Sequence, residues 1–230
     1  MSEDMAIYLQ GTPVIDCDNE TVRRYAVEKA GDAGDNLAMA VRLYYAVRDD
    51  IRYDPYSLDL TVEGLRASAT LAARRGWCVA KAILLAACCR VVGIPARLGF
   101  ADVRNHLTTA RLRELMKTDV FYWHGYTSIF LEGAWVKATP AFNIELCRKF
   151  RLHPLEFDGR HDSIYQPYDL EGNRHMEYIR YRGEFADVPI DAIRETFMRI
   201  YQAGADLAGS DFDKEVDEET SGGRPPKKNR

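Results

Sequence analysis

The sequence predicts an α+β fold in which helices pack on an antiparallel sheet. Up to about residue 92 the apolar residues recur mainly at helical spacing, whereas from 94 to 140 several segments are rich in aromatic and β-branched residues. An "EG" pair at 132–133 looks like a hairpin turn between two of these segments. Helices and strands that occupy separate stretches of one chain are typical of α+β domains.

Two amphipathic helices are expected first, at 18–31 and 35–51. The segment "DNETVRRYAVEKAG" begins with Asp/Asn capping residues and ends at Gly31, where a glycine is favoured after a helix. The segment "DNLAMAVRLYYAVRDDI" repeats the apolar spacing, and Pro55 closes the region. A third helix, "CVAKAILLAACCRVV" at 78–92, is apolar on nearly every face, so we expect it to be buried at the centre.

The predicted strands lie in the middle of the chain. "PARLGF" at 95–100 and "VFYWHGYTSIFL" at 120–131 have strand composition, and the polar helical stretch "TTARLRELMK" separates them. After the turn at 132–133, the segment "AWVKAT" at 134–139 forms the second strand of a hairpin, and Pro140 ends the pairing.

The carboxyl-terminal third predicts another hairpin, a helix and a tail. Within 163–181, "SIYQPYD" and "HMEYIRY" flank the turn "LEGN", and "PIDAIRETFMRIY" at 189–201 has the spacing of an amphipathic helix. The segment 209–230 changes from acidic to basic and contains only two large apolar residues, so we expect it to be disordered.

Length and composition favour one globular domain. The 230 residues are 47% hydrophobic and 29% charged, which suffices for one substantial core. We assign a single domain to 1–208, with a core at about 35–143 and a sheet and helix extension at 144–208. The net charge of −4 gives no support for binding to nucleic acid or to an anionic membrane.

The sequence also predicts a soluble cytoplasmic protein. The start, "MSEDMAIYLQ", lacks the basic and apolar regions of a secretory signal, and no run of about 18 apolar residues occurs. The five cysteines are an odd number without CxxC spacing, which argues against a disulfide framework and a zinc knuckle. We expect reduced thiols and no cofactor, and the sequence leaves the oligomeric state open.

Cys78 is the cysteine best placed to act as a nucleophile. It begins the apolar helix, where unsatisfied amides and the helix dipole stabilise a thiolate. Gly76 permits a tight backbone turn, and the amide of Cys78, with the indole of Trp77, would face a developing oxyanion. Cys88 and Cys89 lie in the middle of the helix and lack this setting. The alternative is that Cys78 is a small buried residue, which is the commoner role at such a position.

His124, inside the aromatic strand, is the candidate general base. A strand in the interior of a sheet holds an imidazole more rigidly than a loop does. If the hairpin turn is 132–133, strand geometry puts His124 opposite Ala141, with Thr139 and Asn143 as diagonal neighbours. Either neighbour supplies a third member, and Cys-His-Asn is a known variant of the catalytic triad.

These residues together carry a resemblance. "GWCVAKAILLAACCRVVGIPARLGF" is similar to the core of the transglutaminase-like superfamily, in which a glycine shortly precedes the nucleophilic Cys and "GIPAR" leads from an alanine-rich helix into a strand. A His in the next strand and a strand that ends near Asp-Pro complete that pattern. Here the matching pieces are Cys78, "GIPAR" at 93–97, His124 and "WVKATP" at 135–140, and the resemblance spans roughly 35–143.

The sequence departs from the family pattern at one position. Where the family has Asp before the proline, this chain has Thr139. Asn143 could orient the imidazole through its amide oxygen, and Thr139 could do so through its hydroxyl; we favour Asn143. Because neither group stabilises an imidazolium as well as a carboxylate does, activity is expected to be reduced or specialised.

The resemblance implies a papain-like scaffold and acyl transfer on a peptide or protein amide. The thiolate of Cys78 would attack the carbonyl, His124 would protonate the leaving amine, and the thioester would pass to water or to a second amine. Hydrolysis is favoured because the sequence shows none of the accessory domains of crosslinking enzymes. The competing hypothesis is a binding module that kept the scaffold without the activity.

Substrate contacts are expected near the nucleophile and in one loop. Trp77 is the first candidate, and "ADVRNHLTT" at 101–109 could reach over the cleft with Arg104 and His106, although a solvated loop is equally compatible. No metal site is predicted, because the spacing of the remaining histidines fits no short ligand pattern. Those histidines are His153, His161 and His175.

Overall fold

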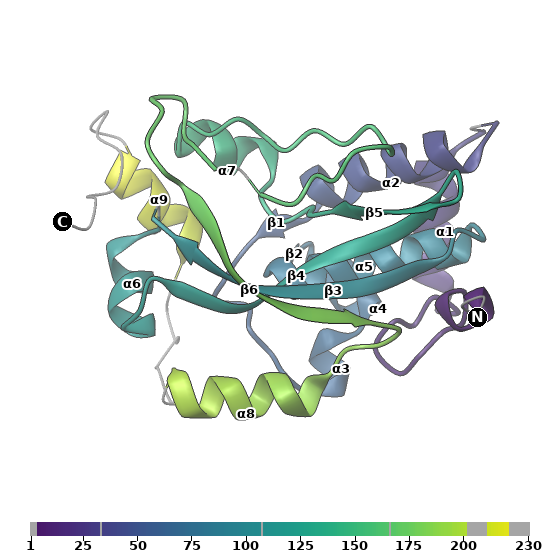
Figure 1. Cartoon of the computed structure of the whole chain (residues 1–230), viewed down its shortest axis with the longest axis horizontal. Coiled ribbons are helices and arrows are strands. Elements are labelled where there is room, and N and C mark those ends of the chain that lie inside the picture. Colours follow the sequence, from purple (N-terminus) through teal and green to yellow (C-terminus); the bar gives the residue numbers. More distant parts are fainter. Residues whose placement is uncertain (1–3, 33, 107, 166, 202–210, 221–230) are drawn as a thin grey trace.

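A four-stranded antiparallel sheet with strand order β5-β4-β3-β6 lies against a layer of helices (Figure 1). The computed structural model describes residues 4–32, 34–106, 108–165, 167–201 and 211–220. The strands are β3 (Ala96–Asn105), β4 (Val120–Leu131), β5 (Ala134–Ala138) and β6 (Met176–Phe185). This arrangement confirms the predicted α+β class with helices on an antiparallel sheet.

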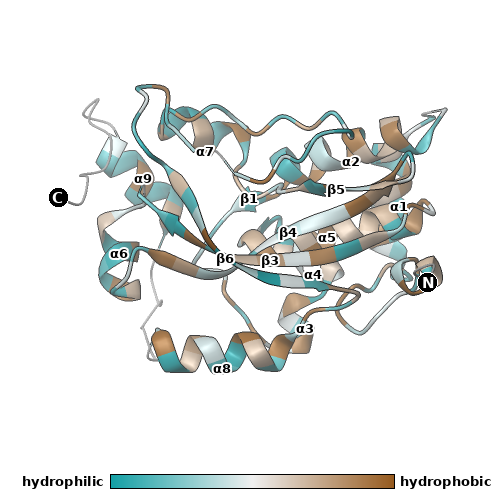
Figure 2. Ribbon diagram, in the orientation of Figure 1, coloured by the Kyte–Doolittle hydropathy of each residue, from teal (hydrophilic) through white to brown (hydrophobic). Residues whose placement is uncertain are grey.

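The helix α5 (Cys78–Val91) is the buried centre of the helical layer, as its composition predicts. Every residue of α5 up to Arg90 is buried, and Figure 2 shows the apolar colouring of this helix behind the sheet. Around α5 pack α1 (Glu20–Ala30), α2 (Asn36–Asp50) and α4 (Ala67–Ala73). None of the described helices is long and apolar enough to cross a membrane.

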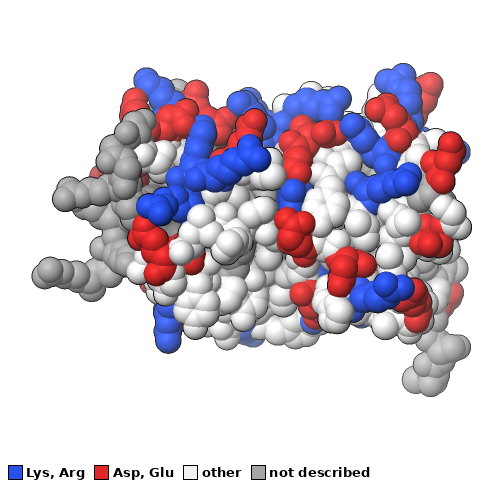
Figure 3. Space-filling view, turned by 90° about the horizontal axis from the view of Figure 1, so that it is seen from above, with Lys and Arg blue, Asp and Glu red and all other residues white. Residues whose placement is uncertain are grey.

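Short elements complete the described chain. They are η1 (Met5–Tyr8), β1 (Arg52–Tyr53), α3 (Val62–Leu65), β2 (Arg75–Gly76), α6 (Ala110–Met116), α7 (Ile144–Lys149), α8 (Ile190–Ile200) and α9 (Phe212–Thr220). β1 and β2 form a separate parallel pair in which Tyr53 lies opposite Gly76. This pairing brings Tyr53 beside the turn that leads into α5. Figure 3 shows acidic and basic side chains interspersed on one face of the molecule.

The hairpin between β4 and β5 has the predicted turn, and its register is confirmed next to that turn, where Leu131 lies opposite Ala134. The pairing ends where Thr127 meets Ala138, so the predicted pairing of His124 with Ala141 is wrong. Beyond β5 the chain turns to another partner: the amide of Thr139 donates to the carbonyl of Ser163 at 2.8 Å, and Pro140 has no amide to donate.

Two segments differ from the prediction because β3 lies in the sheet interior. Residues 101–105 continue β3 and pair with both β4 and β6, so this part of the expected loop is strand. The predicted hairpin within 163–181 is reduced to a single bridge between Tyr168 and Arg174, since β6 pairs with β3 instead. Residues 107 and 166 lie outside the described part of these segments.

The described part of the tail, 211–220, is helical, whereas the sequence predicts disorder over 209–230. Its two large apolar residues, Phe212 and Val216, are both buried. Phe212 meets the rings of Tyr53 and Tyr56 at centroid distances of 5.8 and 5.9 Å. Two apolar residues at helical spacing therefore anchor α9, and the other tail residues lie outside the described chain.

The acidic residues of α9 bind α6 and its surroundings. Glu215 accepts hydrogen bonds from the hydroxyls of Tyr56 at 2.6 Å and Thr109 at 3.1 Å. Glu219 accepts a bond from the amide of Ala110, the first residue of α6, at 2.8 Å. The acidic composition that predicts disorder thus also supplies these contacts.

Candidate active site

Cys78 occupies the first position of α5, as predicted. The preceding residue, Trp77, is the N-cap, and its side chain makes no capping hydrogen bond. The amide of Lys81 donates to the carbonyl of Trp77 at 3.1 Å as part of the first turn. The amides of Cys78 and Val79 remain directed at the thiol of Cys78 and hydrogen-bond to it. The helix terminus therefore provides the amide setting that the sequence predicts.

Burial dominates the protonation of the Cys78 thiol. It raises the pKa of Cys78 to about 11, while hydrogen bonds from the amides of Gly125, Val79 and Cys78 oppose that rise. At neutral pH the resting group is therefore a thiol, and a thiolate must form during the reaction.

Gly125 is a site residue that the sequence analysis does not single out. A Cβ at this position would lie 2.9 Å from the Cα of Val79, so the absence of a side chain lets β4 approach the start of α5. Two residues further, the hydroxyl of Thr127 donates to the carbonyl of Ala82 at 2.8 Å and joins the same strand and helix. An isolated glycine directly after His124 in a strand is the signal that could have identified it.

A bulge precedes His124 in β4. The pairing of β4 with β3 shifts at this point, and Trp123 adopts a left-handed backbone conformation with φ +59°. The amide of Trp123 donates to a buried carboxylate, that of Asp102, at 3.2 Å, and Arg182 donates to both oxygens of the same carboxylate at 2.7 to 3.0 Å. This ion pair holds the bulge from which His124 projects.

The imidazole of His124 lies between two cavities. A larger one, of about 130 Å³, is lined by both His124 and Cys78, and a second of about 10 Å³ is lined by His124 and Thr139. Burial lowers the pKa of His124 to about 4, so the ring is neutral at rest. Within the described chain, neither Nε2 of His124 nor the hydroxyl of Thr139 has a hydrogen-bond partner, and both atoms are buried.

Asn143, the favoured third member, makes a hydrogen bond to β1. Its side-chain oxygen accepts a hydrogen bond from the amide of Tyr53 at 3.1 Å and fixes β1, and Asn143 lines neither of the two cavities that His124 lines. The expected diagonal contact fails because the β4-β5 pairing ends before it reaches His124. Thr139, the alternative third member, lines the smaller cavity together with His124, although its hydroxyl bonds no group in the described chain.

Of the predicted substrate contacts, only Trp77 lines the cavity at Cys78. Arg104 pairs with Asp119 at 3.1 Å and with Glu177 at 3.7 Å, and His106 lies 3.3 Å from Glu177. Neither Arg104 nor His106 lines that cavity, because their end of β3 is held between β4 and β6. In the described parts of the chain, no three His, Cys, Asp or Glu side chains gather as metal ligands would.

A comparison of the sequence with protein-family models identifies the family, and the matched residues include both Cys78 and His124. The family model described as the transglutaminase-like superfamily matches residues 23–140, which span the helical layer, β3, the His124 strand and the hairpin. The chain belongs to this superfamily. The assignment confirms the resemblance that "GWC", "GIPAR" and His124 indicate, and none of the curated protein sequences that were compared matches the chain.

Solved structures similar to this superfamily member have low sequence identity to it. A candidate cysteine protease from Cytophaga hutchinsonii is 17% identical with a TM-score of 0.47, covering 80% of this chain and 55% of its own length. A candidate protease from Parabacteroides distasonis is 12% identical with a TM-score of 0.37, covering 55% of this chain and 25% of its own. The chain thus spans about half of the first protein and a quarter of the second.

Proposed function

We propose that the chain is a cysteine-dependent enzyme that hydrolyses an amide bond of a peptide or protein through a thioester. The observation that carries the proposal is that Cys78, at the amino terminus of α5, and His124, on β4, line one cavity. A thiol at a helix terminus and a buried imidazole facing the same space are the two groups that such a reaction requires. The superfamily assignment supports the same chemistry.

The protonation states set the order of the steps. The resting pair is a thiol and a neutral imidazole, so His124 first takes the proton of the Cys78 thiol as the sulfur attacks the carbonyl carbon. The carbonyl oxygen becomes an oxyanion, for which the backbone amides at the start of α5 are available donors. His124 then gives its proton to the leaving amine, and a thioester remains on Cys78.

Water completes the cycle. His124, neutral again, takes a proton from a water molecule that attacks the thioester, and the acid product leaves as the proton returns to the sulfur of Cys78. A primary amine in place of water would give a new amide, which is the transferase form of the same chemistry. We propose hydrolysis as the principal outcome.

The unpartnered Nε2 of His124 supports the competing hypothesis of a binding module. A family carboxylate at position 139 would hold the imidazolium, whereas Thr139 leaves the buried ring without that support. If the pair is inactive, the scaffold and the cavity remain available for binding alone.

Selective alkylation of the folded chain tests the proposal. Iodoacetamide, mapped by mass spectrometry, should modify Cys78, which lines the cavity, before Cys88, Cys89 and Cys147, which do not, and the partly exposed Cys17 is the reference for an accessible thiol. The rate at Cys78 should rise with pH because its pKa is raised to about 11. Labelled casein should be cleaved by the wild type and by Cys147→Ala, and not by Cys78→Ala. A fluorescent primary amine in the same assay shows whether acyl transfer competes with hydrolysis.

The alkylation and cleavage results can also contradict the proposal. If all cysteines react together and only on unfolding, or if Cys78→Ala cleaves as fast as wild type, Cys78 is not the nucleophile. Retained partner binding in an uncleaving Cys78→Ala chain and an equally uncleaving wild type would favour the binding module.

A further inference from the structure

We propose that the cavity at Cys78 receives an uncharged side chain of about the size of a benzene ring, adjacent to the amide bond that is cleaved. This inference rests on the proposed function and names the substrate class of the same site. The cavity has a volume of about 130 Å³, and Cys78 and His124 are among the residues that line it.

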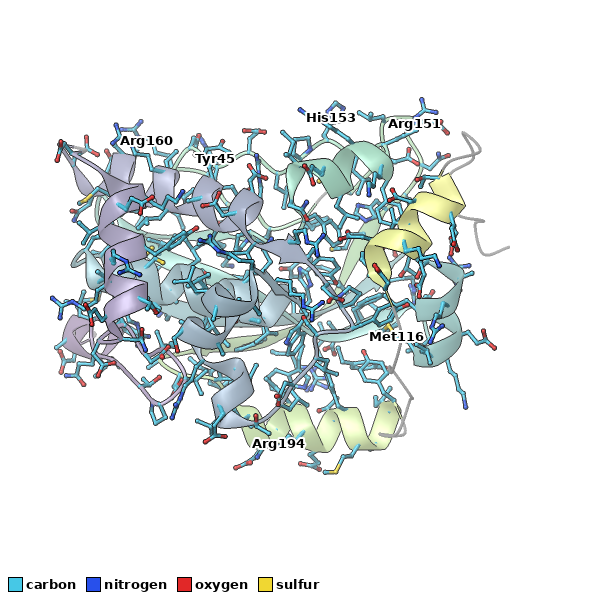
Figure 4. All side chains as sticks on the ribbon, turned by 180° about the vertical axis from the view of Figure 1, so that it is seen from behind. Tyr45, Met116, Arg151, His153, Arg160 and Arg194 are labelled. Atoms are coloured by element: carbon cyan, nitrogen blue, oxygen red, sulfur yellow. The ribbon has the colours of Figure 1, made fainter. Side chains whose placement is uncertain are left out.

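The walls of the cavity are apolar. The lining includes Trp77 and Phe197, whose ring centroids are 6.0 Å apart, and α6 contributes Leu112, Leu115 and Met116. Figure 4 shows Met116 pointing from α6 toward the body of the molecule. No Lys, Arg, Asp or Glu is among the described residues that line this space. A charged side chain of the substrate would therefore lose its hydration without gaining a counter-charge.

Two of the four tyrosines in the lining, Tyr56 and Tyr201, bind other groups through their hydroxyls. The hydroxyl of Tyr56 donates to Glu215 at 2.6 Å. The hydroxyl of Tyr201 donates to the carbonyl of Val120 at 3.2 Å and accepts from the amide of Tyr122 at 2.9 Å. Because these two polar ends are engaged elsewhere, Tyr56 and Tyr201 contribute their rings to the apolar wall of the cavity.

The volume sets the size of the favoured group. An apolar cavity of about 150 Å³ in another protein stays dry and binds benzene, so a cavity of this size accommodates a phenyl or isobutyl group. Filling such a pocket changes kcat/KM by about 10- to 200-fold between close analogues. A side chain much larger than phenyl would have to displace α6 or the Trp77 and Phe197 rings.

A series of small amides tests the preference. N-acetyl-Xaa anilides with Phe, Leu, Gly and Asp at Xaa vary the acyl side, and a second series with Gly at that position varies the residue on the amine side. One methylene in an apolar pocket already changes kcat/KM by about 10- to 200-fold, so in one of the two series kcat/KM for Phe and Leu should exceed that for Gly by at least about 10-fold, and Asp should fall below Gly. The series that shows the preference identifies the side of the bond that occupies the cavity.

Two substitutions on α6 provide a matched pair. Leu115→Trp places an indole in the cavity and should reduce the ratio of the Phe rate to the Gly rate to about 1. Glu114→Trp adds the same bulk at the exposed neighbouring position of α6 and should keep the wild-type preference. Equal rates for Phe, Gly and Asp in the wild type, or an equal loss for all substrates in Leu115→Trp, overturn the inference.

Binding to Cys78→Ala separates this inference from the proposed function. Calorimetry with N-acetyl-Phe-amide and N-acetyl-Asp-amide should show binding of the first only, since the cavity is retained without the thiol. Selective binding in a chain whose wild type shows no turnover contradicts the proposed function and supports the apolar pocket. Turnover that depends on Cys78 with no side-chain preference contradicts the pocket and supports the proposed function.

Discussion

Cys78 and His124 face the same cavity, but their surroundings differ in kind. Around Cys78, backbone amides from α5 and β4 reach the sulfur. Around His124, the buried Nε2 has no partner in the described chain, and the neighbouring hydroxyl of Thr139 has none either. Hydrogen bonds from backbone amides to Cys78 persist as long as the fold does. A hydrogen bond from one side chain to His124 depends on a single residue, and it is lost when Thr replaces the Asp of the family pattern.

Removal of the imidazole should have the largest effect on turnover. His124→Ala deletes the group that moves both protons, and general acid-base catalysis contributes about 10²- to 10⁴-fold, so kcat should fall by that factor. The measurement is kcat on labelled casein, with circular dichroism as the control for folding. A loss below 3-fold would mean that His124 is a core residue and that the two surroundings cannot be compared as parts of one site.

Acid should destabilise the fold through the same ring. The folded pKa of about 4 lies below the ordinary value of 6.5, so between pH 6.5 and 4 the unfolded chain binds a proton that the folded chain does not. The stability present above pH 6.5 is therefore lost as the pH falls, by about 3 kcal/mol in total. Urea unfolding at several pH values measures this loss. Between pH 6.5 and 4, the free energy of unfolding of His124→Leu should fall by about 3 kcal/mol less than that of the wild type. The same pH dependence in both chains would contradict the burial effect.

Asn143→Ala should affect stability rather than chemistry. It removes the acceptor for the buried amide of Tyr53, which costs about 1–3 kcal/mol. Urea unfolding should show that loss, Asn143→Asp should recover most of it because it retains an acceptor oxygen, and kcat should be unchanged at temperatures where the chain is folded. A drop in kcat with unchanged stability would restore Asn143 as the third member of the triad.

Thr139→Asp should strengthen the weaker side of the site. A carboxylate beside His124 favours the imidazolium and should raise its pKa from about 4 by about 1–3 units, with a rise in kcat of about 10-fold. An NMR titration of the ring measures the first effect. Thr139→Val removes only the unpartnered hydroxyl, so it should leave the pKa of His124 unchanged and should change kcat by no more than about 2-fold. If Val and Asp behave alike, position 139 does not act on the ring.

The parts of the fold and site that follow from local pattern could be predicted. The apolar α5, the place of Cys78 as its first residue and the Glu132-Gly133 turn each depend on residues that are neighbours in sequence. The register at His124 could not be predicted, because the pairing of β4 with β5 ends when Thr139 bonds to Ser163, and that contact depends on a remote loop.

The bulge at Trp123 and the helix α9 were missed for related reasons. The bulge depends on Asp102 and Arg182, which come from two other strands and whose pairing no spacing reveals. For α9, two apolar residues in an acidic segment were too few to indicate a helix by composition, and only packing against Tyr53 and Tyr56 gives them a buried surface.

The hydrogen bonds between α9 and the α6 region connect the candidate site to a distant stretch of sequence. Cys78 and His124 lie within the part that matches the superfamily, but the α6 wall of their cavity is braced by Glu215 and Glu219, near the end of the described chain. A chain that ended before α9 would keep Cys78 and His124 and lose the contacts of Glu215 and Glu219 with the α6 region. If the proposed function holds, changes in α9 would alter substrate preference without touching the proposed catalytic pair.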